Sequence, residues 1–168
     1  PPPGATFIHC DVRDRAAISR TVAQVARASG GAVDVLCNNV GVVLEAGTPL
    51  HETSDDAWDT TLAVNLTSYF KFSQACIPLM LKNGSGSIIN TSSVQGLQSM
   101  PGVCAYAASK GAVSSLTRQM AVEYARQGIR AFALVACDAH PVCCLSCSGA
   151  RTLLFGLHLC DQSHLVLA

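Results

Sequence analysis

Two short motifs organise this sequence: Ser92-Ser93-Val94 and, further along, Tyr106-Ala107-Ala108-Ser109-Lys110. A tyrosine and a lysine four residues apart share one face of a helix, about one turn from each other. An ammonium group at that distance favours the phenolate form of a tyrosine, which proton exchange at neutral pH requires. Ser93 adds a hydroxyl thirteen residues before Tyr106. We interpret Ser93, Tyr106 and Lys110 as a candidate catalytic trio.

The spacing of tyrosine and lysine is a weak signal by itself, because a surface tyrosine and lysine on any helix would show it too. Ser92 also competes with Ser93 as the hydroxyl donor, although the residue immediately before Val94 is the better match. The elements and motifs around the trio therefore decide the interpretation.

Strands and helices alternate along the chain. We expect strands at residues 5–10, 33–37, 86–91 and 129–135, and helices at residues 13–29, 53–83 and 104–127. The strands are almost entirely apolar, which is typical of a parallel sheet buried on both faces and joined by right-handed crossovers. The sequence thus predicts an α/β fold: a partial Rossmann-type, doubly wound parallel sheet in three αβα layers.

Polar residues follow three of the expected strands. Asp11 follows the first, Asn38-Asn39-Val40-Gly41 follows the second, and Ser92-Ser93 follows the third. Ligands of such folds bind at the carboxyl ends of the strands. We therefore expect one composite site there, although Asp11 could instead cap the next helix and residues 38–41 could form only a turn.

Length and composition exclude several classes of partner. The 168 residues suit one domain, and the net charge is zero without a basic stripe, which argues against nucleic acid. The apolar runs are shorter than the roughly 20 residues that cross a bilayer, so we expect no membrane partner. Cys10, Cys37, Cys76 and Cys104 occur singly in apolar contexts, as free thiols of a reducing compartment do. We expect a cytoplasmic protein, and residues 1–4 show no feature of a secretory signal.

Taken together, the motifs resemble those of the short-chain dehydrogenase/reductase family over residues 5–130, about three quarters of the chain. The matches follow the family's order: Asp11-Val12, Asn38-Asn39-Val40-Gly41 (with valine for the family's alanine), Asn65, Ser93, and Tyr106 with Lys110. Asn65 lies within an expected helix, where asparagine is unfavourable by propensity, which points to a functional reason for it.

The resemblance implies an oxidoreductase that uses NAD or NADP and interconverts a small-molecule carbonyl and a secondary alcohol. It assigns catalytic roles to Asn65, Ser93, Tyr106 and Lys110. Tyr106 would exchange the proton, Ser93 would hold the reacting oxygen, and Asn65 would position a water between Lys110 and solvent. It also implies cofactor contacts from Asp11, Val12, Asn38, Val40, Gly41, Tyr106 and Lys110, and no metal site.

The sequence departs from the family at both ends. The family opens with a strand and a Gly-rich turn for the pyrophosphate, whereas this sequence opens where the third strand is expected. This predicts a truncated chain that lacks the first βαβ unit: a partial NAD(P)-binding domain at residues 1–135, followed by an atypical Cys-rich tail at 136–168. Disorder is one alternative for the tail. Another is a zinc site formed by Cys144, Cys147, Cys160 and His164.

A second function class stays open at the level of sequence. The chain could be a catalytically silent fragment that acts as an interaction module. The helices expected at residues 53–83 and 104–127 resemble the family's dimerisation helices, so a homo-oligomer formed through them is part of that alternative. Binding of a nicotinamide cofactor would distinguish the enzyme from the silent fragment.

Overall fold

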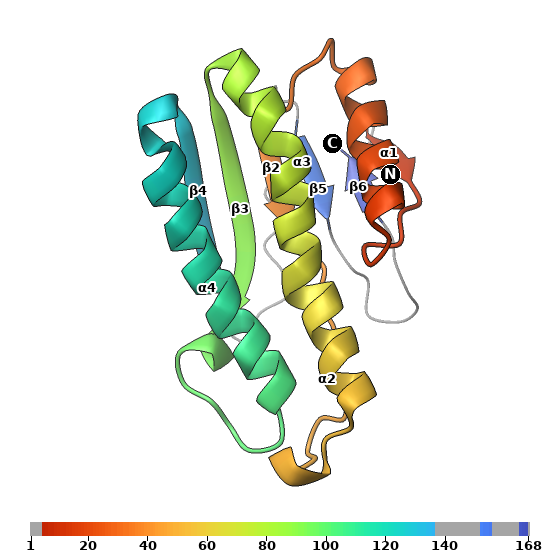
Figure 1. Cartoon of the computed structure of the whole chain (residues 1–168), viewed down its shortest axis with the longest axis vertical. Coiled ribbons are helices and arrows are strands. Elements are labelled where there is room, and N and C mark those ends of the chain that lie inside the picture. Colours follow the sequence, from red (N-terminus) through yellow and green to blue (C-terminus); the bar gives the residue numbers. More distant parts are fainter. Residues whose placement is uncertain (1–4, 137–151, 156–164, 168) are drawn as a thin grey trace.

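Helices and strands alternate along most of the chain (Figure 1). The structure, a computed structural model, describes residues 5–136, 152–155 and 165–167. The strands are β1 (Thr6–Ile8), β2 (Val35–Asn38), β3 (Gly86–Ser93), β4 (Ile129–Ala136), β5 (Thr152–Phe155) and β6 (Leu165–Leu167). The α-helices are α1 (Arg15–Ala28), α2 (Asp55–Leu62), α3 (Ser68–Asn83) and α4 (Cys104–Tyr124). Short 3-10 turns occupy Leu50–Glu52, Val94–Gly96 and Ala125–Gln127.

The strands form one sheet in the order β1-β6-β5-β2-β3-β4. β2 pairs in parallel with β3 and β5, and β3 pairs in parallel with β4, which confirms the α/β class with a parallel sheet. β6 is antiparallel to both of its neighbours, β1 and β5. The tail therefore contributes two strands that were not expected from its sequence, and they stand between β1 and β2.

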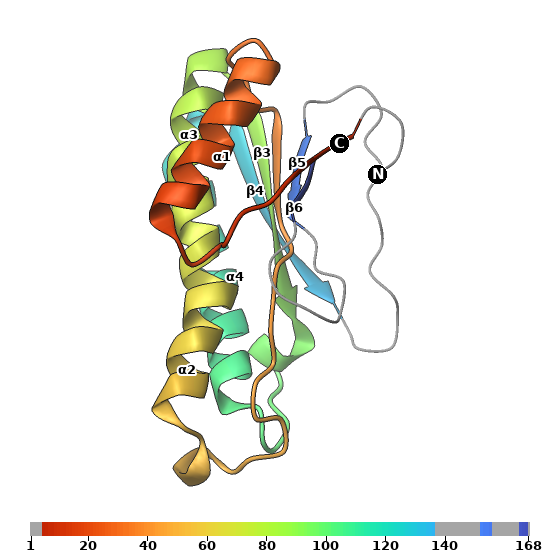
Figure 2. The ribbon, with the colours of Figure 1, turned by 90° about the vertical axis from the view of Figure 1, so that its right-hand side faces the viewer.

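All four helices cover the same face of the sheet, as Figure 2 shows. The crossovers from β1 to β2, β3 and β4 all progress in one direction across the sheet. Right-handed crossovers that progress in one direction place their helices on one face. The described residues thus supply two of the three layers expected for this class, and Phe132 and Leu134 of β4 stay partly exposed.

The core lies between α3 and the sheet. Its largest fully buried side chains include Tyr69 and Phe72 of α3, Leu36 of β2 and Ile88 of β3. α1 packs against α3 and adds the buried Ile18. This packing buries the apolar faces that the sequence predicts. Removal of apolar surface from water is the main force that holds the elements together.

The helix boundaries differ from the expected ones for identifiable reasons. α1 begins at Arg15 because the side chain of Asp14 accepts a hydrogen bond from the Ala16 amide and caps the helix. The single helix expected at 53–83 is divided by a π-helical turn at Ala63–Thr67. No helix in the described part of the chain is long and apolar enough to cross a membrane.

Candidate active site

Lys110 lies at the centre of the site, on α4. Its side chain is only 3% exposed, and its Nζ donates a hydrogen bond of 2.7 Å to the Thr91 carbonyl at the end of β3. The same nitrogen lies 5.5 Å from the ring centre of Tyr69 and 5.6 Å from that of Tyr106. Burial lowers the pKa of Lys110 to about 8, because the charged form has lost its hydration.

The two tyrosines beside Lys110 are in different states. Tyr69 is fully buried, and its hydroxyl donates a hydrogen bond of 2.8 Å to the Val40 carbonyl. Burial raises the pKa of Tyr69 well above its ordinary value, so it remains a neutral phenol. Tyr106 is only partly buried. Of these two phenols, Tyr106 is therefore the one that a ligand can reach.

Asn65 joins the loop after β2 to α4. Its Oδ1 accepts a hydrogen bond of 2.8 Å from the Val42 amide, and its Nδ2 donates to the Val42 carbonyl at 2.9 Å and to Ser109 Oγ at 3.1 Å. Its position in the π-helical turn accounts for an asparagine inside a helical segment. The side-chain amide is thus committed to protein groups, so a water held by Asn65 would have to contact its backbone.

Gly41 passes close to this centre. A Cβ atom placed on Gly41 would lie 3.6 Å from Asn65 Oδ1 and 3.6 Å from Lys110 Nζ. The side chains of Asn38 and Val40 instead point into the core, where Asn38 Nδ2 donates a hydrogen bond of 2.8 Å to Asn90 Oδ1. Asn38 and Val40 therefore have only backbone groups to offer a ligand.

Ser92 and Ser93 have different partners. Ser92 Oγ donates a hydrogen bond of 3.0 Å to the Lys110 carbonyl and lies 2.7 Å from Ser114 Oγ, so Ser92 is used in packing β3 against α4. Ser93 Oγ accepts a hydrogen bond of 3.2 Å from the Gln95 amide. That bond leaves the hydroxyl proton of Ser93 free to be donated, which favours Ser93 over Ser92.

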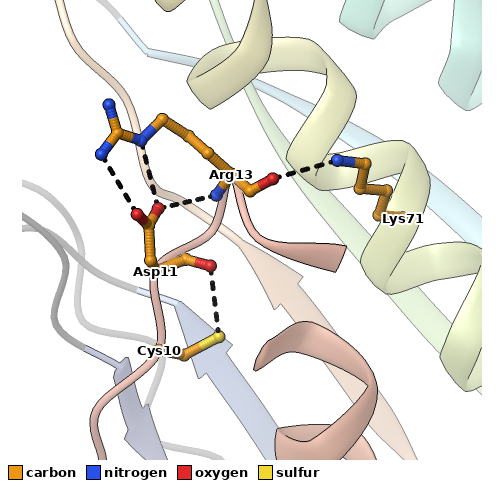
Figure 3. A network of polar contacts seen from close by, with 4 residues as sticks. All are labelled: Cys10, Asp11, Arg13 and Lys71. Atoms are coloured by element: carbon orange, nitrogen blue, oxygen red, sulfur yellow. Dashed lines mark hydrogen bonds and ion pairs between the residues drawn. The ribbon is translucent and has the colours of Figure 1, made fainter. Parts of the chain in front are cut away.

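Asp11 and Val12 lie apart from this centre, near the carboxyl end of β1. The Asp11 carboxylate accepts hydrogen bonds from Arg13 Nε at 3.2 Å, Nη2 at 3.1 Å and the backbone amide at 2.9 Å (Figure 3). The Arg13 side chain lowers the pKa of Asp11. Asp11 does not cap α1, because Asp14 does. Val12 is buried.

The structure therefore gathers the expected residues only in part. Gly41, Asn65, Tyr106 and Lys110 surround one point, and Ser93 follows Thr91 on the same strand. Asp11 is separated from them because β6 and β5 stand between β1 and β2, a distance of roughly 14 Å at the usual strand spacing.

Three residues that the sequence reasoning missed complete the centre. Tyr69 and the Thr91 carbonyl hold Lys110. A Cβ atom on Gly96 would lie only 2.7 Å from the Lys110 carbonyl carbon, so this loop needs glycine to pack against α4. Tyr69 could have been found by its spacing of four residues from Asn65, whereas a backbone carbonyl leaves no signal in the sequence.

In the part of the chain that the structure describes, no three His, Cys, Asp or Glu residues come together as metal ligands. The zinc alternative at Cys144, Cys147, Cys160 and His164 lies outside the described residues.

Polar groups lie at the carboxyl ends of β2 and β3, which is the edge where parallel α/β sheets bind their ligands. The family model described as short chain dehydrogenase matches residues 3–138. The chain belongs to the short-chain dehydrogenase family.

Known relatives extend well beyond this chain. It is 45% identical over 123 residues to "Inactive 2-(S)-hydroxypropyl-CoM dehydrogenase 2" of Xanthobacter autotrophicus, a match that covers 73% of this chain and 52% of the relative. The crystal structure of an NAD+-bound xylitol dehydrogenase is 33% identical, with a TM-score of 0.74 over 79% of this chain and 50% of that one. A gluconate 5-dehydrogenase from Burkholderia cenocepacia, in complex with NADP and tartrate, is 37% identical, with a TM-score of 0.70 over 76% and 49%. The chain spans about half the length of these relatives.

Proposed function

We propose that the protein is an NAD- or NADP-dependent oxidoreductase that interconverts a carbonyl and a secondary alcohol by hydride transfer. The observation that carries this proposal is the buried Lys110 ammonium beside the ring of the partly exposed Tyr106. Placing a lysine there is unfavourable for stability, so a catalytic use explains it better than packing does. The solved NAD+ and NADP complexes among its structural relatives support the choice of cofactor.

In this proposal Tyr106 gives a proton to the carbonyl oxygen during reduction and takes one from the alcohol during oxidation. Lys110 favours the phenolate form through its positive charge, which the low-polarity surroundings strengthen. Ser93 donates its hydroxyl proton to the reacting oxygen and stabilises the charge that develops there. Asn65 keeps the Gly41 segment beside Lys110 through its two bonds to Val42.

The described residues fit both ends of such a cofactor. Near Lys110, the close approach of Gly41 leaves no side chain in the space where a ribose would meet the ammonium. At the other end, the ionised Asp11 carboxylate can accept hydrogen bonds from an adenine, with Val12 beside it. The bound nicotinamide supplies the hydride. None of the described residues forms the family's Gly-rich phosphate turn.

Replacing one phenol tests the proposal. Tyr106→Phe removes the proton donor and keeps the ring, so NAD(P)H-dependent reduction of a carbonyl panel should fall by at least about 100-fold, in the range of general acid–base catalysis. Tyr124→Phe, at the last residue of α4, is the matched control and should keep full turnover. Equal turnover of wild type and Tyr106→Phe would show that the acid–base role is wrong.

A second candidate function is a catalytically silent module that pairs through its helices. Large apolar side chains are exposed on them: Trp58 of α2, Phe70 of α3 and Val122 of α4, the last at 81%. One relative, the inactive 2-(S)-hydroxypropyl-CoM dehydrogenase 2, is itself described as inactive, which supports considering this candidate. Sedimentation of the protein with and without Val122→Glu, combined with titration of NADH and NADPH, separates the two candidates. A dimer that binds neither nucleotide favours the silent module.

We also propose the limits of the functional unit and its location. The unit comprises residues 1–135, and residues 136–168 are an atypical Cys-rich tail that lies almost entirely beyond the family match. The thiols of Cys10, Cys76 and Cys104 are free, which supports a cytoplasmic location. A small-molecule carbonyl or alcohol is the partner that this site accommodates.

A further inference from the structure

Lys110 carries a buried charge that no carboxylate among the described residues balances. None of the ion pairs in that part of the chain includes Lys110. Its pKa of about 8 still leaves it mainly charged at neutral pH. Because Lys110 is only 3% exposed, water offsets little of the cost of burial, and the hydrogen bond to the Thr91 carbonyl offsets only part of it. The aromatic rings beside the ammonium are the remaining groups that can stabilise it.

Tyr69 supplies one of these rings. Lys110 Nζ lies over it, 5.5 Å from its centre, a distance at which a cation is attracted to the negative face of an aromatic ring. Tyr69 is fully buried, so solvent does not screen this attraction. The ring of Tyr106, at 5.6 Å, is only partly buried. Of the two rings, Tyr69 is therefore the one that water cannot displace from the ammonium.

The hydroxyl of Tyr69 is committed elsewhere. It donates a hydrogen bond of 2.8 Å to the Val40 carbonyl, and burial raises the pKa of Tyr69 well above its ordinary value. Tyr69 therefore remains neutral beside the ammonium. A carboxylate in its place would bind Lys110 more strongly, but it would also cancel the positive charge that favours the phenolate form of Tyr106. A neutral ring attracts the cation and leaves its charge intact.

Tyr69 also acts together with Asn65, about one helical turn before it. Tyr69 binds the Val40 carbonyl, and Asn65 binds both backbone groups of Val42. The two side chains thus fix the loop after β2 on both sides of Gly41, whose added Cβ atom would lie 3.6 Å from Lys110 Nζ. The ring and the hydroxyl of Tyr69 therefore serve two neighbouring parts of the same centre.

We propose that Tyr69 is a positioning residue: its ring holds the Lys110 ammonium without neutralising it, and its hydroxyl fixes the loop at Val40. This inference rests on the proposed oxidoreductase function and adds a residue to the same site. It separates the two phenols beside Lys110 by role, because Tyr106 exchanges the proton while Tyr69 keeps the charge in place.

Changing the charge distribution of the ring at nearly constant shape tests the first part. Tyr69→Phe is compared with Tyr69→pentafluorophenylalanine, incorporated at this position by amber suppression, because fluorines withdraw electron density from the ring face. The sequence contains three lysines, Lys71, Lys82 and Lys110, so NMR of lysine labelled with ¹³C at Cε follows each titration, and Lys110→Met assigns the third signal. The titration midpoint of Lys110 should lie about one pH unit lower with the fluorinated ring.

Phe72→pentafluorophenylalanine is the matched control, since Phe72 is also fully buried on α3, and it should leave the Lys110 midpoint unchanged. Equal midpoints with the two rings at position 69, or a higher one with the fluorinated ring, would overturn the inference. If the pentafluoro variant does not fold, 3,4,5-trifluorophenylalanine at position 69 should give a smaller shift in the same direction, and the same outcomes apply.

Tyr69→Phe alone tests the second part, because it keeps the ring and removes the bond to Val40. The Val42 amide, which donates to Asn65 Oδ1, should exchange with solvent about tenfold faster in this variant, while the Lys110 midpoint stays near that of wild type. Unchanged exchange at Val42 would show that the hydroxyl does not fix the loop. These measurements need neither cofactor nor turnover, so failure of the oxidoreductase function would appear separately, in the Tyr106→Phe turnover assay.

Discussion

Two charged centres of this molecule differ in their exposure to solvent. Lys110 is 3% exposed and is held by a backbone carbonyl between two aromatic rings, whereas the Asp11 and Arg13 side chains are 40% and 50% exposed and pair with each other. Burial changes the pKa of Lys110 strongly, while the exposed pair is screened by solvent and salt. The proposed chemistry is therefore concentrated where the fold accepts a desolvated charge.

The largest expected effect is the pH dependence caused by Lys110. In the folded state its pKa is about 8, below the ordinary value of 10.5, so between these pH values the unfolded chain binds a proton that the folded chain does not. Stability therefore rises with pH across this window, by about 3 kcal/mol. Below pH 8 Lys110 is protonated in both the folded and the unfolded state, so the folded protein bears the full cost of burying the charge.

Comparison with Lys110→Met isolates this contribution. Buried thiols such as Cys76, whose pKa burial raises to about 12, act in the opposite direction at alkaline pH in both proteins. The free energy of unfolding of wild type minus that of Lys110→Met, measured by urea denaturation at pH 7.5 and 10.5, should increase by about 3 kcal/mol. If this difference in the free energy of unfolding were the same at both pH values, Lys110 would be hydrated in the folded protein.

Gly96 tests how tightly the buried centre is packed. In Gly96→Ala the new Cβ would meet the backbone of Lys110 and Gly111 at 2.7–2.9 Å, so α4 or the loop must move. We expect a loss of about 2–3 kcal/mol in urea unfolding. Gly111→Ala is the matched control on the other side of the same contact. Its Cβ would lie 3.5 Å from the Gly96 carbonyl, so it should be neutral or stabilising by up to about 1 kcal/mol.

Thr61 tests whether satisfied hydrogen bonds are what make buried polar groups tolerable. Its hydroxyl is buried without a partner among the described residues, so Thr61→Val should stabilise the protein by about 1 kcal/mol. Thr117 is equally buried, but its Oγ1 accepts a hydrogen bond of 2.9 Å from Asn90 Nδ2. Thr117→Val should therefore destabilise the protein by about 1–2 kcal/mol. In thermal unfolding, Tm should rise in Thr61→Val and fall in Thr117→Val.

The smallest effect should come from the exposed pair. Arg13→Ala is expected to change the free energy of unfolding by no more than about 0.5 kcal/mol, and less at high salt. Because Arg13 lowers the pKa of Asp11, this contribution is present at neutral pH and disappears as the pH falls through that lowered value. A change above 2 kcal/mol would contradict the contrast with Lys110.

Most of the fold could be predicted because its signals are local. Apolar periodicity and capping residues located α1, α4 and strands β1 to β4 within a few residues, together with the start of α2 and the end of α3. The π-helical turn that separates α2 from α3 was not predicted. β3 extends to Ser93 because its last residues pair with β4, which local pattern does not show. β5 and β6 were not predicted, since strands of four and three residues in an atypical tail depend on pairing with distant partners.

In the candidate site, too, some features could be predicted from the sequence and others could not. Ser93, Asn65, Tyr106 and Lys110 could be named from motif spacing, because side-chain identity carries that information. The partners that hold them are mainly backbone groups, the Thr91 carbonyl for Lys110 and the Val42 amide and carbonyl for Asn65. Backbone groups are the same in every residue, so only the folded structure reveals them.

The pairing of β1 with β6 has a consequence for how the chain acquires its structure. Thr6 lies opposite Leu167 and Ile8 opposite Leu165, so two strands about 160 residues apart in the sequence pair with each other. β1 can therefore join the sheet only after residues 165–167 have been synthesised, while β2, α3 and β3 can assemble earlier from closer neighbours. Such long-range pairing raises contact order and slows folding. We expect β1 to be the last strand to gain protection from hydrogen exchange during refolding.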